Sequence, residues 1–134
     1  MASPAFAISD DANPWLAIEN AMCVAHRTVD YVSLVGAPVE IETADWTGAM
    51  NGLPTHCHVA GTVAGNAFDF RLPMTWNGTL SLGECMAPTS VEALNQGAAT
   101  VFGDVSAQTA VLLSAVTARH YDAPITQQVW ADCD

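Results

Sequence analysis

Apolar and polar residues alternate along three stretches in the first part of the chain, and this alternation predicts β-strands. Residues 39–43 alternate with period two, as expected for a strand with one face in water. Residues 56–62 and 66–72 are two further strands joined through a short turn that contains Gly65 and Asn66, which predicts a β-hairpin. In its second strand the apolar side chains point one way and the charged ones the other.

Helical spacing of apolar residues occurs near both ends of the chain. Residues 14 to about 25 are expected to form an amphipathic helix, because an Asn-Pro pair opens the segment. A short helix is a candidate at 91–94. A longer helix, rich in small apolar residues, is expected from 107 to about 120, with Asp104 or Ser106 as its cap.

The remaining apolar segments are short and bounded by turn residues. We expect strands at 79–82, at 98–102 between two glycines, and at 125–130. An antiparallel start followed by strand, helix and strand predicts an α/β fold with a mixed sheet and flanking helices. No repeat, linker or low-complexity run divides residues 1–134, so a single domain is expected.

Charge and composition exclude some classes of partner. The chain has no lysine, and it has three arginines against 14 acidic residues, which gives a net charge of −11. No basic patch is available to contact a phosphate backbone, so we expect no nucleic-acid partner. No apolar run approaches the roughly 20 residues that a membrane span needs, so no membrane partner is expected.

The cysteines indicate an oxidising compartment. Cys23, Cys57, Cys85 and Cys133 permit three pairings, and their sequence alone does not choose among them. The chain has no Cys-x-x-Cys, so zinc ribbons and thioredoxin-type sites find no support. The N-terminal residues read as a mature secreted start rather than as a signal peptide. A secreted or periplasmic location follows as the expectation.

From residue 52 onward the chain carries an ordered series of short motifs. They read Gly-Leu-Pro-Thr-His-Cys-His-Val-Ala-Gly at 52–61, Phe-Asp-Phe-Arg-Leu-Pro at 68–73, Trp-Asn-Gly at 76–78, Gly-Ala-Ala-Thr-Val at 97–101, His-Tyr-Asp-Ala-Pro at 120–124 and Val-Trp-Ala-Asp-Cys-Asp at 129–134. In this order they resemble the N-terminal half of the tannase/feruloyl esterase family of α/β-hydrolases. The resemblance implies a partial hydrolase-like sheet, in which an antiparallel hairpin precedes parallel strands.

The catalytic serine of that family sits in a Cys-Ser pair on a sharp turn after a strand. Here the pair reads Cys133-Asp134, and a carboxylate cannot supply an alkoxide-like nucleophile. The acid and the histidine of the triad would come from beyond position 134. The resemblance therefore implies the N-terminal part of a secreted serine hydrolase of aromatic acid esters, and we expect no activity from this chain alone.

The segment that would hold the oxyanion is also altered. The family has a glycine-rich run after Trp-Asn-Gly, whereas this chain has Gly83 followed by Glu84, which would oppose a developing negative charge. The alternative is an ordinary exit from a strand. The resemblance implies a disulfide between Cys23 and Cys57. A bridge between Cys85 and Cys133 is a further hypothesis, with free or intermolecularly paired thiols as its alternative.

Histidines and tryptophans offer other sites. His56 and His58 share one face of a strand and could grip a metal, but no third ligand is placed, so we expect neither a metal nor a cofactor. A nucleophilic pair of Cys133 and His120 is disfavoured in an oxidising compartment. Trp76 could stack on a ligand, although core packing is favoured. With His56 and His58 it is our candidate for a ligand pocket.

Two alternative functions remain open. The chain could be a small secreted binding domain that contains disulfides and takes a small-molecule or aromatic ester ligand. Half of an α/β sheet exposes an edge strand, so such a domain is expected to pair with a second copy or with a complementary chain. The other alternative is a small α+β barrel or cone, in which His56, His58, Asp69 and Arg71 would line a central pocket.

Overall fold

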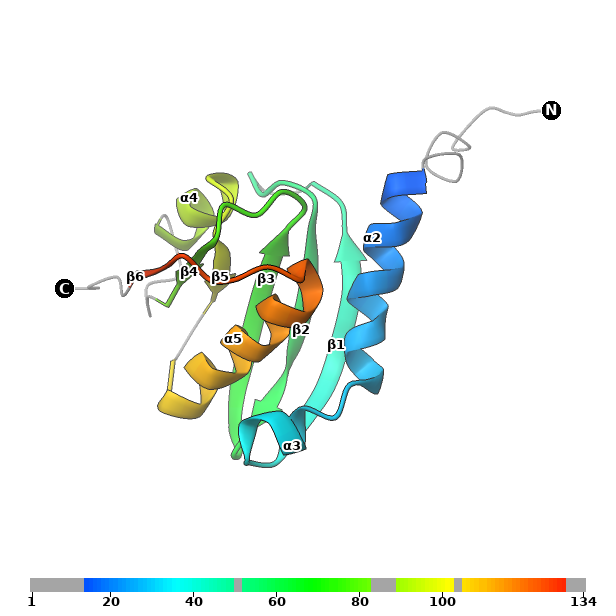
Figure 1. The fold of residues 1–134 in the computed structure, drawn as a ribbon. Coiled ribbons are helices and arrows are strands. Elements are labelled where there is room, and N and C mark those ends of the chain that lie inside the picture. Colours follow the sequence, from blue (N-terminus) through cyan, green and yellow to red (C-terminus); the bar gives the residue numbers. More distant parts are fainter. Residues whose placement is uncertain (1–13, 50–51, 83–88, 103–104, 130–134) are drawn as a thin grey trace.

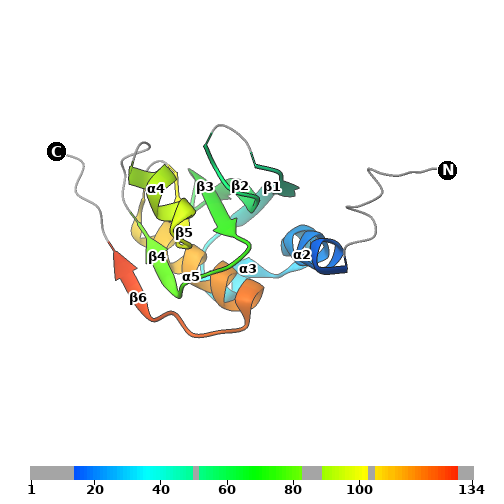
Figure 2. The ribbon, with the colours of Figure 1, turned by 90° about the horizontal axis from the view of Figure 1, so that it is seen from above.

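A six-stranded mixed sheet organises the chain, with helices on both of its faces (Figures 1 and 2). The structure is a computed structural model that describes residues 14–49, 52–82, 89–102 and 105–129. In chain order its elements are α2 (Pro14–Val24), the 3₁₀ helix η1 (Ala25–Thr28), α3 (Tyr31–Val35), β1 (Val39–Thr47), β2 (His56–Val63), β3 (Asn66–Pro73), β4 (Thr79–Ser81), α4 (Thr89–Asn95), β5 (Ala99–Val101), α5 (Ala107–Tyr121) and β6 (Gln127–Val129).

The strands lie in the order β1-β2-β3-β5-β4-β6. The first three strands are antiparallel to their neighbours, β5 is antiparallel to β3, and β4 is parallel to both β5 and β6. The expected α/β class, with a mixed sheet of antiparallel and parallel strands, is confirmed. The alternative of a small barrel or cone is wrong, because β1 and β6 lie at opposite edges of an open sheet.

The predicted hairpin is present and well defined. Strands β2 and β3 pair in unbroken register from His56 opposite Pro73 to Val63 opposite Asn66. The two residues of the turn, Ala64 and Gly65, have φ angles of 51° and 82°. Two successive positive φ angles define a type I′ turn, whose twist matches that of the flanking strands.

The main core fills the face of the sheet that α2 and α5 cover. Helix α5 crosses β2 and β3, and α2 runs beside β1 (Figure 1). Leu112 and Val116 of α5 belong to one buried cluster with Val59 and Phe70 of the hairpin. Helix α4 packs against β5 and β3 from the other face (Figure 2). Among the described residues, no helix combines the length and the apolar character needed to cross a membrane.

Two elements differ most from the expectation. Strand β1 extends to Thr47 instead of ending at residue 43, because a bulge between Ile41 and Thr43 shifts the register and interrupts the simple alternation. Helix α3 was not expected from the pattern. It is held by its caps: the side chain of Asp30 accepts from the backbone N–H of Ser33, and Gly36 closes the helix at a φ of 78°.

Gly61 makes the bulge in β1 possible. A Cβ atom at this position would overlap the backbone carbonyl of Glu40, which cannot move without disturbing the pairing of β1 and β2. We expect Gly61→Ala to lower the free energy of unfolding by about 1–3 kcal/mol, as overpacked sites do. Urea denaturation measures this loss. Gly48→Ala is the matched control, because no atom lies within 4 Å of its added Cβ. Equal stability of both variants would contradict the prediction.

Candidate functional site

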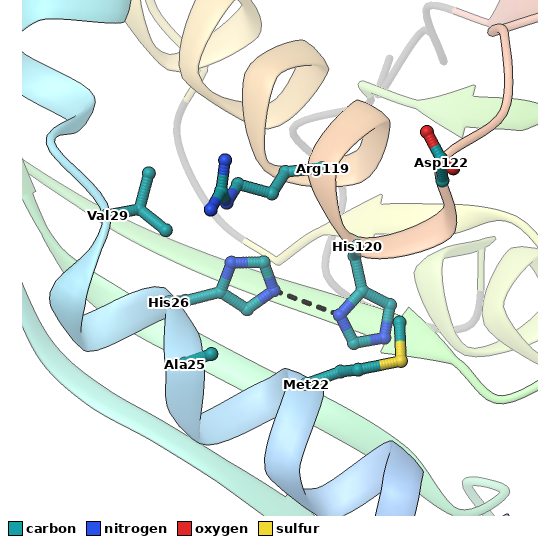
Figure 3. Close-up of a pocket in the computed structure, with 7 residues that line it drawn as sticks. All are labelled: Met22, Ala25, His26, Val29, Arg119, His120 and Asp122. Carbon is teal, nitrogen blue, oxygen red and sulfur yellow. Dashed lines mark hydrogen bonds between the residues drawn. The ribbon is translucent and has the colours of Figure 1, made fainter.

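Two histidines from distant parts of the sequence meet between α2 and α5. His26 lies in η1, directly after α2, and His120 lies in the last turn of α5. The Cys23–Cys57 disulfide holds the end of α2 against β2. Helix α5 also packs against β2, which brings its last turn close to the end of α2. There the two imidazoles stack, and His26 Nε2 lies 2.9 Å from His120 Nδ1 (Figure 3).

The histidine pair continues at both ends into further polar groups. The hydroxyl of Tyr31 lies 2.6 Å from His26 Nδ1. At the other end, His120 Nε2 lies 3.8 Å from Glu19 Oε2. Both of these last atoms are buried, and neither has a hydrogen-bond partner among the described residues. If Tyr31 donates to His26 and both rings are neutral, His26 donates to His120, and the remaining N–H of His120 faces the carboxylate of Glu19.

Burial sets the protonation of this cluster. It lowers the pKa of His26 to about 3, with the neighbouring His120 and Arg119 adding to the effect, and it lowers the pKa of His120 to about 4. Burial raises the pKa of Tyr31 to about 12, and it also raises the pKa of Glu19. Both imidazoles are therefore neutral near pH 7. A general base works best with a pKa near the working pH, so the lowered pKa values of this pair do not favour it as a general base near pH 7.

A pocket of about 330 Å³ opens onto the histidine pair (Figure 3). Its walls differ in character: Met22, Ala25 and Val29 form an apolar side, while Arg119 and Asp122 bring charge from the end of α5. One ring nitrogen of each histidine and the sulfur of Cys57 lie within 4.8 Å of one another. These three donors come from three different elements, η1, α5 and β2.

A second polar cluster occupies the opposite face of the hairpin. Arg71 donates to both carboxylate oxygens of Asp69, at 2.8 and 3.2 Å. His58 Nε2 lies 3.1 Å from the same carboxylate. Burial raises the pKa of Asp69, but its contacts with His58 and Arg71 outweigh this effect and hold the pKa below its usual range. The guanidinium of Arg71 also lies over the ring of Phe102.

The proposed ligand-pocket residues are fixed by protein contacts. His56 Nδ1 donates to the carbonyl of Pro54 at 2.8 Å, and its Nε2 accepts from Arg71 at 3.1 Å. With both nitrogens engaged, His56 has no lone pair for a metal shared with His58. Trp76 donates to the carbonyl of Thr79 and stacks on Tyr121. The structure thus gives each of these residues protein partners, and their role in a ligand pocket stays a prediction.

The positions that the hydrolase resemblance singled out lie outside the described residues. These are Gly83, Glu84, Cys85, Cys133 and Asp134. The strands that lead toward them are described: Gly83 comes after β4 and Cys133 after β6. These two strands are parallel neighbours, with Ser81 paired to Val129.

Sequence reasoning missed the buried histidine pair. Its two members are 94 residues apart, and no local pattern links them. One signal was available: Cys23 and His26 are three residues apart at the end of a helix, a spacing that turns both side chains to one side. Models of known protein families were compared with the chain and none matches, and a search of curated proteins also finds no match.

Proposed function

We propose that this chain is a secreted, hydrolase-like binding domain that does not cleave esters and that pairs with a second copy through β6. The observation that carries the proposal is the character of β6, an edge strand with no charged residue and with all three residues exposed. The topology of the sheet supports the hydrolase-like part, and the residue at position 134 supports the lack of esterase activity.

The topology supports a ligand crevice at the position that the resemblance implies. The chain leaves β4, passes through α4 and enters β5 on one side of β4, and then passes through α5 to β6 on the other side. In open α/β sheets, ligands bind outside the carboxyl ends of the strands where the direction of winding reverses. Here that point lies between β4 and β6. The segments that resemble the oxyanion loop and the nucleophile turn both follow these ends.

The residue at position 134 argues against catalysis. An ester hydrolase needs a hydroxyl or thiol nucleophile beside a base. The residue in the position of the family's serine is Asp134. The crevice is therefore better suited to holding a small-molecule ligand, such as an aromatic ester, than to cleaving one.

The two edge strands, β1 and β6, differ in the features that oppose pairing with another strand. At β1, acidic residues, a bulge and the adjacent α2 all oppose pairing with another strand. Arg27 even donates to the bulge carbonyl of Glu42. Strand β6 reads Gln-Gln-Val and, within the part of the chain that the structure describes, has none of these protections. An unprotected edge is a template for a further strand, and an uncharged one avoids repulsion between two copies of this acidic protein.

Gln128 presents the free backbone groups of this edge. The N–H of Gln127 donates to Gly78, and the carbonyl of Val129 accepts from Leu82, so these two residues face β4. Alternate residues of a strand turn their backbone groups to opposite sides, so Gln128 directs its N–H and carbonyl outward. A second β6 in antiparallel orientation would exchange hydrogen bonds with them.

Analytical ultracentrifugation at micromolar concentration tests the proposal, and we expect a dimer. Gln128→Pro removes the outward N–H and keeps the ladder to β4, a change that edge strands accept. Two hydrogen bonds would be lost per dimer, at about 1 kcal/mol each, so Kd should rise roughly thirtyfold. Gln128→Thr is the matched control, because it keeps the N–H and should stay dimeric.

Two results would contradict the proposal. If the wild-type protein is a folded monomer at all accessible concentrations, the proposed dimerisation through β6 is wrong. Turnover of methyl gallate or methyl ferulate that disappears on substitution of Asp134 would show that the chain is an unorthodox esterase. The two measurements are independent, so each half fails separately.

A further inference from the structure

The disulfide and the histidine pair together make a compact set of metal-ligand atoms. Cys57 Sγ and one nitrogen of each histidine lie within 4.8 Å of one another, and Cys23 Sγ is bonded to Cys57 Sγ. All four residues are at most 2% exposed. Two sulfurs and two imidazoles are a common donor set for tetrahedral Zn²⁺. In the disulfide, however, the sulfurs are not thiolates, and thiolates are the form that binds zinc.

The outer contacts of both histidines match what a metal site requires. A ligating histidine usually donates its second N–H to a carboxylate or another acceptor, which fixes the ring. If His26 binds through Nε2, its Nδ1–H faces the hydroxyl of Tyr31 at 2.6 Å. If His120 binds through Nδ1, its Nε2–H faces Glu19. Both atoms of this second contact are buried, and neither has a hydrogen-bond partner among the described residues.

We propose that reduction of the Cys23–Cys57 disulfide creates a zinc site formed by Cys23, Cys57, His26 and His120. A dithiol reductant breaks the S–S bond, gives one hydrogen to each sulfur and closes its own disulfide. Binding of Zn²⁺ then releases both thiol protons to solvent. The proton on His26 Nε2 moves to Nδ1, so the histidines keep their net protonation.

The site requires Cys57 and the two histidines to move little, whereas Cys23 must turn its sulfur toward the metal once the S–S bond is broken. Zn–S bonds of about 2.3 Å in a tetrahedron separate two sulfurs by about 3.8 Å. Zn–N bonds of about 2.0–2.1 Å separate two nitrogens by about 3.4 Å, close to the present 2.9 Å. Burial also keeps both rings in the neutral form that ligates metals.

The test compares oxidised and reduced chain after gel filtration without oxygen has removed the dithiol. Zn²⁺ alone is added, and affinity is measured by competition with a chromophoric chelator. We expect one Zn²⁺ per reduced chain, with Kd at least ~100-fold below that of the oxidised chain. Co²⁺ should give the intense visible bands and the thiolate charge-transfer band of a tetrahedral site. Equal affinity of both forms, or no binding by the reduced form, would overturn the proposal.

Variants locate the site. His26→Gln and His120→Gln should each weaken zinc binding by the reduced chain at least ~10-fold, and Glu19→Gln about 10-fold through the outer contact. The Cys85→Ser/Cys133→Ser double variant should bind as tightly as wild type. His58→Gln is the control for the other histidine cluster and should also leave binding unchanged. Loss of binding in either of these two, with binding kept in His120→Gln, would place the metal elsewhere and overturn the proposal.

Folding supplies a second measurement. If reduction unfolds the chain, Zn²⁺ should restore the circular dichroism spectrum of the oxidised protein, because the metal would close the same loop as the disulfide. A reduced chain that stays unfolded with Zn²⁺ present would overturn the proposal as well.

Discussion

Lowering the pH from 7 to 5 should remove about 4 kcal/mol from the free energy of unfolding of the oxidised protein, about 2 kcal/mol for each buried histidine. Burial lowers the pKa of His26 to about 3 and that of His120 to about 4, while an unfolded histidine titrates near 6.5. Between these values the unfolded chain binds more protons than the folded one. Stability therefore rises with pH in this window and is lost as the pH falls from 6.5 toward 4.

Urea denaturation at a series of pH values measures this slope. His26→Gln and His120→Gln should each remove about half of it, and the double variant most of it. The lowered pKa of His56 adds to the slope, whereas the raised pKa of Glu19 opposes it at the acid end. Tyr31→Phe is the control, because it alters a neighbour of His26 but removes no group that titrates in this range. A stability that is flat between pH 5 and 7 would show that the two rings are hydrated in the folded state.

Removing the Cys23–Cys57 disulfide should cost about 4 kcal/mol. The bridge closes a segment with a sequence separation of 34 residues, and the loss of chain entropy in the unfolded state for such a loop is about 4 kcal/mol. The Cys23→Ala/Cys57→Ala double variant isolates this effect, with stability read from urea denaturation. For a chain of this size such a loss is a large part of the usual 5–15 kcal/mol.

The control is urea denaturation of the same double variant with a dithiol added. Its free energy of unfolding should fall no further on account of this bridge, because the bridge is already absent. A loss below about 1 kcal/mol on substitution would contradict the prediction. It would mean that the apolar contacts of α2 with β1 and β2 already hold the helix in place.

Local patterns predicted the hairpin and α5 well, because the hairpin follows from period-two alternation and a short turn, and α5 follows from its small apolar residues and a cap. Ser106 accepts from Thr109 at the start of α5, as one of the two expected caps. The length of β1 was missed, since one extra residue at the bulge changes which side chains face the core. Helix α3 was missed for a different reason: it has only five residues, and its caps rather than its apolar pattern define it.

The site could not be predicted from local patterns, because it depends on how α5 crosses the sheet. His120 reaches His26 only when the last turn of α5 lies against the end of α2. The resemblance implied the Cys23–Cys57 disulfide that brings this end of α2 to β2, and the structure contains it. No sequence pattern predicted that α5, from the far end of the chain, would lie over the Cys23–Cys57 disulfide.

The unequal edges of the sheet would also limit how large the proposed assembly can grow. If β6 pairs with β6 of a second copy, the joined sheet has β1 at both of its outer edges. Each outer edge then carries a bulge, acidic side chains and a flanking helix, so no further strand is accepted. The contact is isologous and uses the same surface on both copies, which closes the assembly at two. A protein with one open edge can therefore dimerise without any path to fibres.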